Sequence, residues 1–186
     1  MTYLSEMNEA IARASRLGLK TPNFQLMEGQ LLNQKVYQDI PYIVRDAMGD
    51  ASLEEVAAQC LSYHMRLLPI LNDYFGTELT YTIGHVAVGS KIYFEQTEDQ
   101  MQALIKSGVT QPQLSIHAWL TLPTCEILDF TLPTTFAMLS KTKEGYGSVL
   151  SGHADRLLND VSYHPMLLGE DYLRRIGALV EFEYFL

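Results

Sequence analysis

The sequence has few cysteines: Cys60 and Cys125 are the only two among 186 residues. Two are too few for the disulfide framework of a small secreted domain. Clusters of lysine and arginine are also missing, and the 22 acidic residues outnumber the 13 basic ones, which gives a formal net charge of −9. Because binding to nucleic acids or anionic membranes requires a basic face, we expect neither as a partner.

Long apolar runs are absent as well. No stretch approaches the ~18 apolar residues of a membrane helix. The first 20 residues lack the apolar core and the small-residue cleavage pattern of a secretory signal. We therefore expect a cytoplasmic protein with free thiols, and export by a specialised secretion machine is left open.

The sequence contains no internal repeat, low-complexity tract or linker, which favours a single domain over residues 1–186. Its composition, 47% hydrophobic and 19% charged, is typical of a folded chain of this length. We divide it into a helical N-terminal segment (1–50), a candidate catalytic core (52–132), and a region of helices with a closing strand (133–186).

Helical periodicity predicts several helices. The predicted segments are residues 2–17, residues 40–48 with Asp39 as the N-cap, residues 52–74 with a capping box at Ser52 and Glu55, and residues 98–107 with Thr97 as the N-cap. Pro69 is expected to kink or interrupt the third of these. Shorter helical turns are predicted at residues 132–139, 153–158 and 169–177.

Runs rich in β-branched and aromatic residues predict strands at 79–88, 91–94, 115–122, 125–132 and 179–186. Gly89-Ser90 indicates a hairpin turn between the first two. The order of the elements predicts an α+β fold, with N-terminal helices packed on a mainly antiparallel sheet.

Three residues could carry chemistry in this arrangement. Cys60 is on a predicted helix, His117 on a following strand and Asp129 on the next strand. In such a set the histidine deprotonates the thiol and later protonates the leaving group. The aspartate accepts the second ring N–H and fixes the tautomer.

The segments that contain these residues are AQCLSYHMRLLPILNDYFG (58–76), TYTIGHV (80–86) and HAWLTLPTCEILDFT (117–131). Together they resemble the core of the transglutaminase-like branch of the papain-fold cysteine enzymes. The resemblance implies that Cys60 is the nucleophile, His117 the general base and Asp129 its orienting partner. It also implies a cofactor-free reaction on an amide or peptide bond through a Cys thioester, with a protein or peptide substrate. A protease, a deamidase and an acyl transferase all fit.

The turn at 123–124 decides whether His117 and Asp129 share a face of the sheet. With a two-residue turn, His117 lies opposite Phe130 and Asp129 points to the other face, because side chains alternate. A three-residue loop over 122–124 instead sets His117 opposite Asp129. The catalytic interpretation therefore requires an odd-length loop or a bulge.

In that register Cys125 lies opposite Thr121, four residues from His117, or about 13 Å along the strand. A nucleophile must lie within hydrogen-bond reach of its base. Cys60 is therefore the only candidate nucleophile. Gln59, Trp119 and His85 are candidate substrate-binding residues, although Trp119 and His85 also fit roles in packing.

Two alternatives stay open. A non-catalytic scaffold domain is favoured by Ala58, where family members usually have glycine, and by the leucines that share a helical face with Cys60. A small metal site formed by Cys60, His64 and His117 also fits the Cys-x3-His spacing, but a second compact ligand pair is lacking. We therefore expect no metal.

Overall fold

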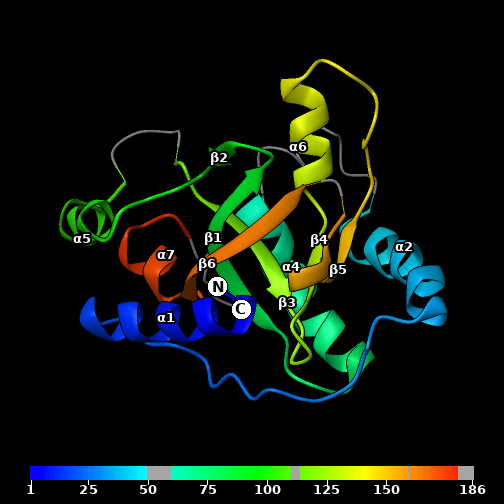
Figure 1. The fold of residues 1–186 in the computed structure, drawn as a ribbon, viewed down its shortest axis with the longest axis horizontal. Coiled ribbons are helices and arrows are strands. Elements are labelled where there is room, and N and C mark those ends of the chain that lie inside the picture. The colour runs from blue at the N-terminus through cyan, green and yellow to red at the C-terminus, as the bar shows by residue number, and fades with distance from the viewer. Residues whose placement is uncertain (50–59, 110–113, 159, 180–186) are drawn as a thin grey trace, which may run out of the picture.

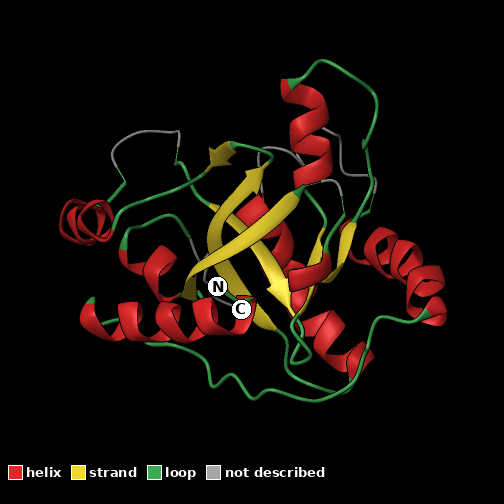
Figure 2. Cartoon of the chain, in the orientation of Figure 1, coloured by secondary structure: helices red, strands yellow, loops and turns green. Residues whose placement is uncertain are grey.

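The computed structural model describes residues 1–49, 60–109, 114–158 and 160–179 (Figure 1). Its helices are α1 (Tyr3–Arg16), α2 (Gln34–Met48), α4 (Cys60–Phe75), α5 (Glu98–Ser107), α6 (Leu132–Leu139), the 3-10 turn η1 (Ala154–Arg156) and α7 (Asp171–Arg175). Its strands are β1 (Thr80–Val88), β2 (Lys91–Tyr93), β3 (His117–Thr121), β4 (Glu126–Asp129), β5 (Leu150–His153) and β6 (Val161–Leu168). The protein has an α+β fold with a curled sheet whose strand pairings are all antiparallel (Figure 2).

β1 is the central strand of the sheet. β3 pairs with its first half and β2 with its last three residues, so these two strands follow one another along one side of β1. β6 pairs along the other side. β4 then continues the sheet from β3, and β5 from β4. This order places the start of β3 and the end of β4 next to each other, where His117 and Asp129 lie.

The two faces of the sheet bury separate apolar clusters. One joins α2, α4 and α7 to residues such as Ala118 and Leu120 of β3. The other joins α1 to Trp119 of the same strand, and α1 packs on β6 (Figure 1). Successive residues of β3 thus enter different clusters, as the alternation of side chains in a strand requires.

Two of the predicted helices, α1 and α5, are confirmed, and α5 has its predicted N-cap Thr97. The side chain of Thr2 caps α1, and Thr97 forms a capping box with Gln100 at the start of α5. The prediction for α2 is wrong at its N-terminus, because the helix begins after Asn33 rather than Asp39. The Asn33 side chain accepts hydrogen bonds from two backbone N–H groups of the first turn, and Asp39 lies inside the helix.

Pro69 was predicted to kink or interrupt the helix, and the interruption is wrong, because α4 is continuous from Cys60 to Phe75. Pro69 lies on the exposed side of this helix, where water can bind the carbonyl that proline leaves without a helical partner. Leu67 and Leu71 are fully buried on the opposite side and hold both halves of the helix against the sheet. The predicted capping box at 52–55 lies outside the described residues. No described helix is both long enough and apolar enough to span a membrane.

The hairpin at Gly89-Ser90 is confirmed, since Val88 pairs with Lys91. Strands β5 and β6 were not predicted, and the helix predicted at 153–158 is reduced to the single turn η1. β6 was not recognised in the sequence because it contains Pro165, and proline cannot donate a backbone hydrogen bond to a neighbouring strand. The structure accommodates Pro165 where the register between β1 and β6 shifts. Apart from Leu179, the predicted closing strand lies outside the described residues.

Candidate active site

His117 and Asp129 form a buried hydrogen-bonded pair at one end of the β3–β4 hairpin. His117 is the first residue of β3, Asp129 is the last of β4, and their side chains are 1% and 0% exposed. The ring nitrogen Nε2 of His117 lies 2.5 Å from Oδ2 of Asp129. The predicted contact between the two side chains is therefore confirmed.

A three-residue loop gives the hairpin this geometry. The N–H of Leu122 donates to the carbonyl of Glu126 (2.8 Å), and the N–H of Cys125 donates back to Leu122 (3.0 Å). Cys125 has a φ of 59°, the left-handed conformation that closes a three-residue hairpin loop. The odd length of the loop is as predicted, but the loop is 123–125 rather than 122–124.

The carboxylate of Asp129 accepts five hydrogen bonds. Oδ2 accepts from His117 and from the hydroxyl of Tyr163 (2.8 Å), and Oδ1 accepts from the N–H groups of Thr131 (2.9 Å) and Leu132 (3.0 Å) and from the Thr131 hydroxyl (3.2 Å). Burial raises the pKa of Asp129, but the His117 charge and these donors outweigh it and hold the pKa well below its usual range. The group is therefore a carboxylate at neutral pH.

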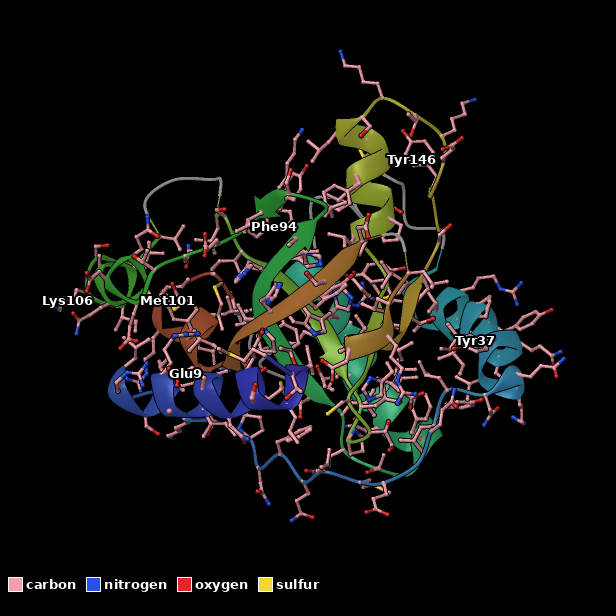
Figure 3. All side chains as sticks on the ribbon, in the orientation of Figure 1. Glu9, Tyr37, Phe94, Met101, Lys106 and Tyr146 are labelled. Atoms are coloured by element: carbon pink, nitrogen blue, oxygen red, sulfur yellow. The ribbon has the colours of Figure 1, made fainter. Side chains whose placement is uncertain are left out.

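The ring of His117 is held between two aromatic rings. Its centroid is 5.2 Å from that of Phe94, at 25° between planes, and 6.1 Å from that of Trp119, at 28°. Phe94 follows β2 (Figure 3) and has a φ of 67°, which non-glycine residues rarely adopt. These contacts fix the plane of the imidazole.

Burial lowers the pKa of His117, but the Asp129 carboxylate and its hydrogen bond, together with the contact with Cys60, outweigh burial and raise the pKa to about 10. The ring is therefore an imidazolium at neutral pH. Because Nε2 is engaged by Asp129, Nδ1 is the nitrogen left for Cys60.

Cys60 is the first described residue of α4, and it is half-buried. Its side chain interacts with the ring of His117, and Sγ lies 3.9 Å from the carbonyl oxygen of Ile116. The structure thus brings together the three residues that the sequence analysis assigned to catalysis. Gln59, a predicted substrate-binding residue, lies outside the described residues.

Cys125 belongs to the β3–β4 loop, at the opposite end of β3 from His117. Its predicted position opposite Thr121 is wrong, because Thr121 pairs with Ile127. Its predicted separation from His117 agrees with the structure, since the whole length of β3 lies between them.

His64 joins the start of α4 to the end of β4. Its Nδ1 is 2.8 Å from the carbonyl oxygen of Cys60, to which it donates, and Nε2 accepts from the N–H of Phe130 at 3.0 Å. Burial and the neighbouring charge of His117 lower the pKa of His64 to about 4, against the attraction of Asp129. The ring is therefore neutral with a fixed tautomer.

Both nitrogens of His64 are thus used by the backbone, and neither can bind a metal ion. The alternative of a metal site at Cys60, His64 and His117 does not fit this geometry. Among the described residues there is also no other group of three or more side chains that could hold a metal.

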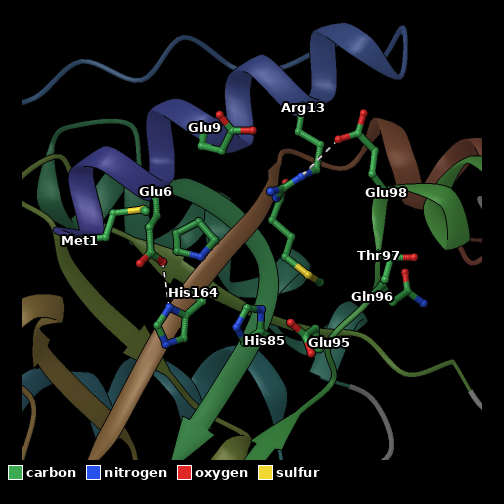
Figure 4. A pocket seen from close by; sticks show the side chains of 12 residues that line it. Met1, Glu6, Glu9, Arg13, His85, Glu95, Gln96, Thr97, Glu98 and His164 are labelled. Atoms are coloured by element: carbon green, nitrogen blue, oxygen red, sulfur yellow. Dashed lines mark hydrogen bonds and ion pairs between the residues drawn. The ribbon is translucent and has the colours of Figure 1, made fainter.

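Two predicted substrate-binding residues have other environments. Trp119 is fully buried behind His117, and its indole N–H donates to the hydroxyl of Tyr3 (2.7 Å), so it supports the ring rather than facing a substrate. His85 stacks on His164, with ring centroids 4.7 Å apart, in a separate cavity of about 410 Å³ beside α1 (Figure 4). None of the three candidate catalytic residues lines that cavity.

Two residues of this site were missed in the sequence analysis, and a third, His64, was assigned another role. Tyr163 was missed because β6 was not recognised, and Phe94 because a stacking partner 23 positions away leaves no local pattern. His64 follows Cys60 by four residues and shares its helical face, and this spacing had suggested a metal ligand rather than a link between α4 and β4.

Comparisons with known proteins add little to this description. No family model and no curated protein matches the chain. One solved structure, a crystal structure described as a genomics target, is similar to this chain. The match covers 81% of this chain and 73% of that one, with 18% sequence identity and a TM-score of 0.45.

Proposed function

We propose that the protein is a Cys–His–Asp thiol enzyme of the transglutaminase-like, papain-like type, which acts on an amide or peptide bond through a thioester. The observation that carries this proposal is the position of His117. Its Nε2 is held by a buried carboxylate, its plane is fixed by two aromatic rings, and its other side interacts with the Cys60 thiol. An imidazolium beside a thiol favours the nucleophilic thiolate.

The geometry supports the following reaction. Cys60 Sγ, with its proton held by His117, attacks the amide carbonyl carbon. The C–N bond then breaks as His117 gives its Nδ1 proton to the leaving amine, which leaves an acyl thioester on Cys60. Water or a second amine attacks the thioester and passes a proton to His117. The C–S bond breaks, and an acid or a new amide is released.

The alternative is a domain of the same type that binds a protein partner without turnover. The complete burial of His117 and the half-burial of Cys60 favour it, since both reacting groups must be reached by a substrate. The two functions differ in the reactivity of the thiol, which is therefore the quantity to measure.

Iodoacetamide labelling of the native protein near pH 7, with the modified sites mapped by mass spectrometry, tests the proposal. We expect fast, selective labelling of Cys60 that is lost in His117→Ala. Cys125 is buried and serves as the internal reference. His85→Ala is the matched control, because it removes a histidine of the separate cavity beside α1. A Cys60 that reacts only after denaturation supports the non-catalytic alternative.

Acyl transfer can be tested directly with a reactive ester. After incubation with p-nitrophenyl acetate and quenching in acid, the enzyme should carry an acetyl group on Cys60 that is absent in Cys60→Ser. Addition of a primary amine before the quench separates the two outcomes. N-acetylation of the amine indicates acyl transfer, whereas release of acetate alone indicates hydrolysis.

A further inference from the structure

We propose that His64 is a positioning residue that holds the Cys60 thiol at His117 by tying α4 to the end of β4. This inference rests on the proposed function, because it concerns the alignment of the same thiol and imidazole. It assigns to His64 no contact with substrate and no proton transfer.

The tie is made by one fully buried ring. Its Nδ1–H donates to the carbonyl of Cys60, the residue that carries the thiol, and its Nε2 accepts from Phe130, the residue that follows Asp129. A single side chain therefore joins the backbone at the nucleophile to the backbone at the orienting carboxylate. The ring also meets that of His117 edge-on, at 6.4 Å between centroids and 82° between planes.

The charge state of His64 fits this role. Nε2 of His64 lies 3.6 Å from Oδ1 of Asp129. A second imidazolium there would compete with His117 for the same carboxylate. Because both nitrogens are engaged by backbone groups, the ring stays neutral and leaves the Asp129 charge to His117.

Three variants separate the two hydrogen bonds. His64→Asn keeps an N–H near the position of Nδ1 and can still donate to Cys60. His64→Gln places an oxygen near the position of Nε2 and can still accept from Phe130. His64→Leu keeps an apolar side chain of similar size and makes neither bond.

The readout is the pH profile of the second-order rate constant for iodoacetamide labelling of Cys60, from pH 5 to 10, with urea unfolding of each variant in parallel. For His64→Leu we expect a loss of at least about tenfold in the His117-dependent rate near pH 7, since small misplacements of reacting groups have large effects. We expect intermediate rates for the Asn and Gln variants. A purely structural role would lower the unfolding midpoint and leave the profile of the folded protein unchanged.

The outcomes distinguish this inference from the proposed function. If wild-type labelling depends on His117 but all folded His64 variants keep the wild-type profile, the positioning role is wrong and the proposed function stands. If wild-type labelling does not depend on His117, the proposed function fails and the positioning role with it. Should His64→Leu fail to fold, the Asn and Gln variants still decide the question, because each retains one of the two bonds.

Discussion

His117 and Asp129 contact each other diagonally across the β3–β4 hairpin. Leu120 faces Leu128, so the continued register places Asp129 opposite Trp119, two positions beyond His117. Diagonal neighbours on one face are within reach of long or aromatic side chains, and here the ring of His117 spans the offset. Because the offset is two residues, both side chains stay on the same face of the sheet.

Replacement of Asp129 by asparagine should break the charged pair without changing its shape. Asparagine offers one acceptor oxygen where the carboxylate offers two, and the buried imidazolium loses its counter-charge. Loss of one partner of a buried ion pair typically destabilises a protein by about 3–5 kcal/mol. We expect a loss of that order in the free energy of unfolding in urea at pH 7, and a lower pKa of His117 in an NMR titration.

The matched control is Asp73→Asn, because Asp73 is exposed at the end of α4. Its effect should stay within about 0.5 kcal/mol. An Asp129→Asn variant as stable as this control would contradict the buried charge pair.

Tyr163→Phe should remove one of the hydrogen bonds that the Asp129 carboxylate accepts. The hydroxyl of Tyr163 donates to Oδ2 of Asp129, while its ring packs edge-on against Trp119 at 4.9 Å, a contact that phenylalanine keeps. A hydrogen bond to a charged group contributes about 1.5–3 kcal/mol, so the free energy of unfolding should fall by that order. Tyr37→Phe, at an exposed position of α2, should leave stability unchanged. Equal stability of the two variants would argue against the Tyr163 bond.

Strand alternation places His117 and Asp129 on one face of the sheet only if the loop between their strands has an odd length, and the sequence left a two-residue turn open as well. The sequence was also not sufficient to fix the register. Loops at 122–124 and 123–125 both have three residues and differ only in where the left-handed residue lies. The structure places it at Cys125, a type for which a positive φ is uncommon, so no local signal marked it.

Long-range contacts decided the other errors. Trp119 was a candidate substrate-binding residue, but Tyr3, 116 positions away, accepts its indole N–H, and the side chain is buried. His85 is separated from the site because it lines the cavity beside α1 with His164 of β6, a strand that Pro165 concealed. The cap at Thr97 was predicted correctly because it involves residues only three positions apart, whereas the cap at Asp39 was wrong because the helix begins earlier, after Asn33.

Gly84→Ala should destabilise the sheet beside the site. A Cβ on Gly84 would lie 2.2 Å from the carbonyl oxygen of His164 and 2.4 Å from Cη2 of Trp119, the residue that backs His117. The carbonyl belongs to the paired strand β6 and cannot move aside alone. We expect a loss of about 1–3 kcal/mol or more in thermal or urea unfolding.

The control for Gly84 is Gly76→Ala. Gly76 has a φ of 64° with no atom within 4 Å of an added Cβ, so only the backbone conformation is strained there, at a cost of about 1–2 kcal/mol. Labelling of Cys60 should also slow in Gly84→Ala and stay unchanged in Gly76→Ala. A Gly84→Ala variant that is no less stable than wild type would show that β6 can shift away from β1.

The raised pKa of His117 predicts a loss of stability in alkali. The pKa of His117 in the folded protein is about 10, against 6.5 for an exposed histidine. Folded protein therefore retains a proton that the unfolded chain has released between these values, and its extra stability declines as the pH rises through about 10. The difference in unfolding free energy between wild type and His117→Gln should be largest below pH 6.5 and should shrink toward pH 10. A pH-independent difference would contradict a charged His117.

The lowered pKa of His64 predicts the opposite dependence in acid. The unfolded chain protonates this histidine near 6.5 and the folded protein only near 4, so unfolded protein binds the additional proton in between. Stability must therefore fall as the pH is lowered from 6.5 to 4, by on the order of 3 kcal/mol from this group. In His64→Leu that part of the acid loss should disappear, while the loss from Asp129 begins only below its ordinary value of 3.8. Unfolding curves measured at half-unit steps from pH 7 to 4 would separate the contribution of His64 from that of Asp129. If the unfolding free energy of His64→Leu falls with pH as steeply as that of the wild type, His64 is not held neutral.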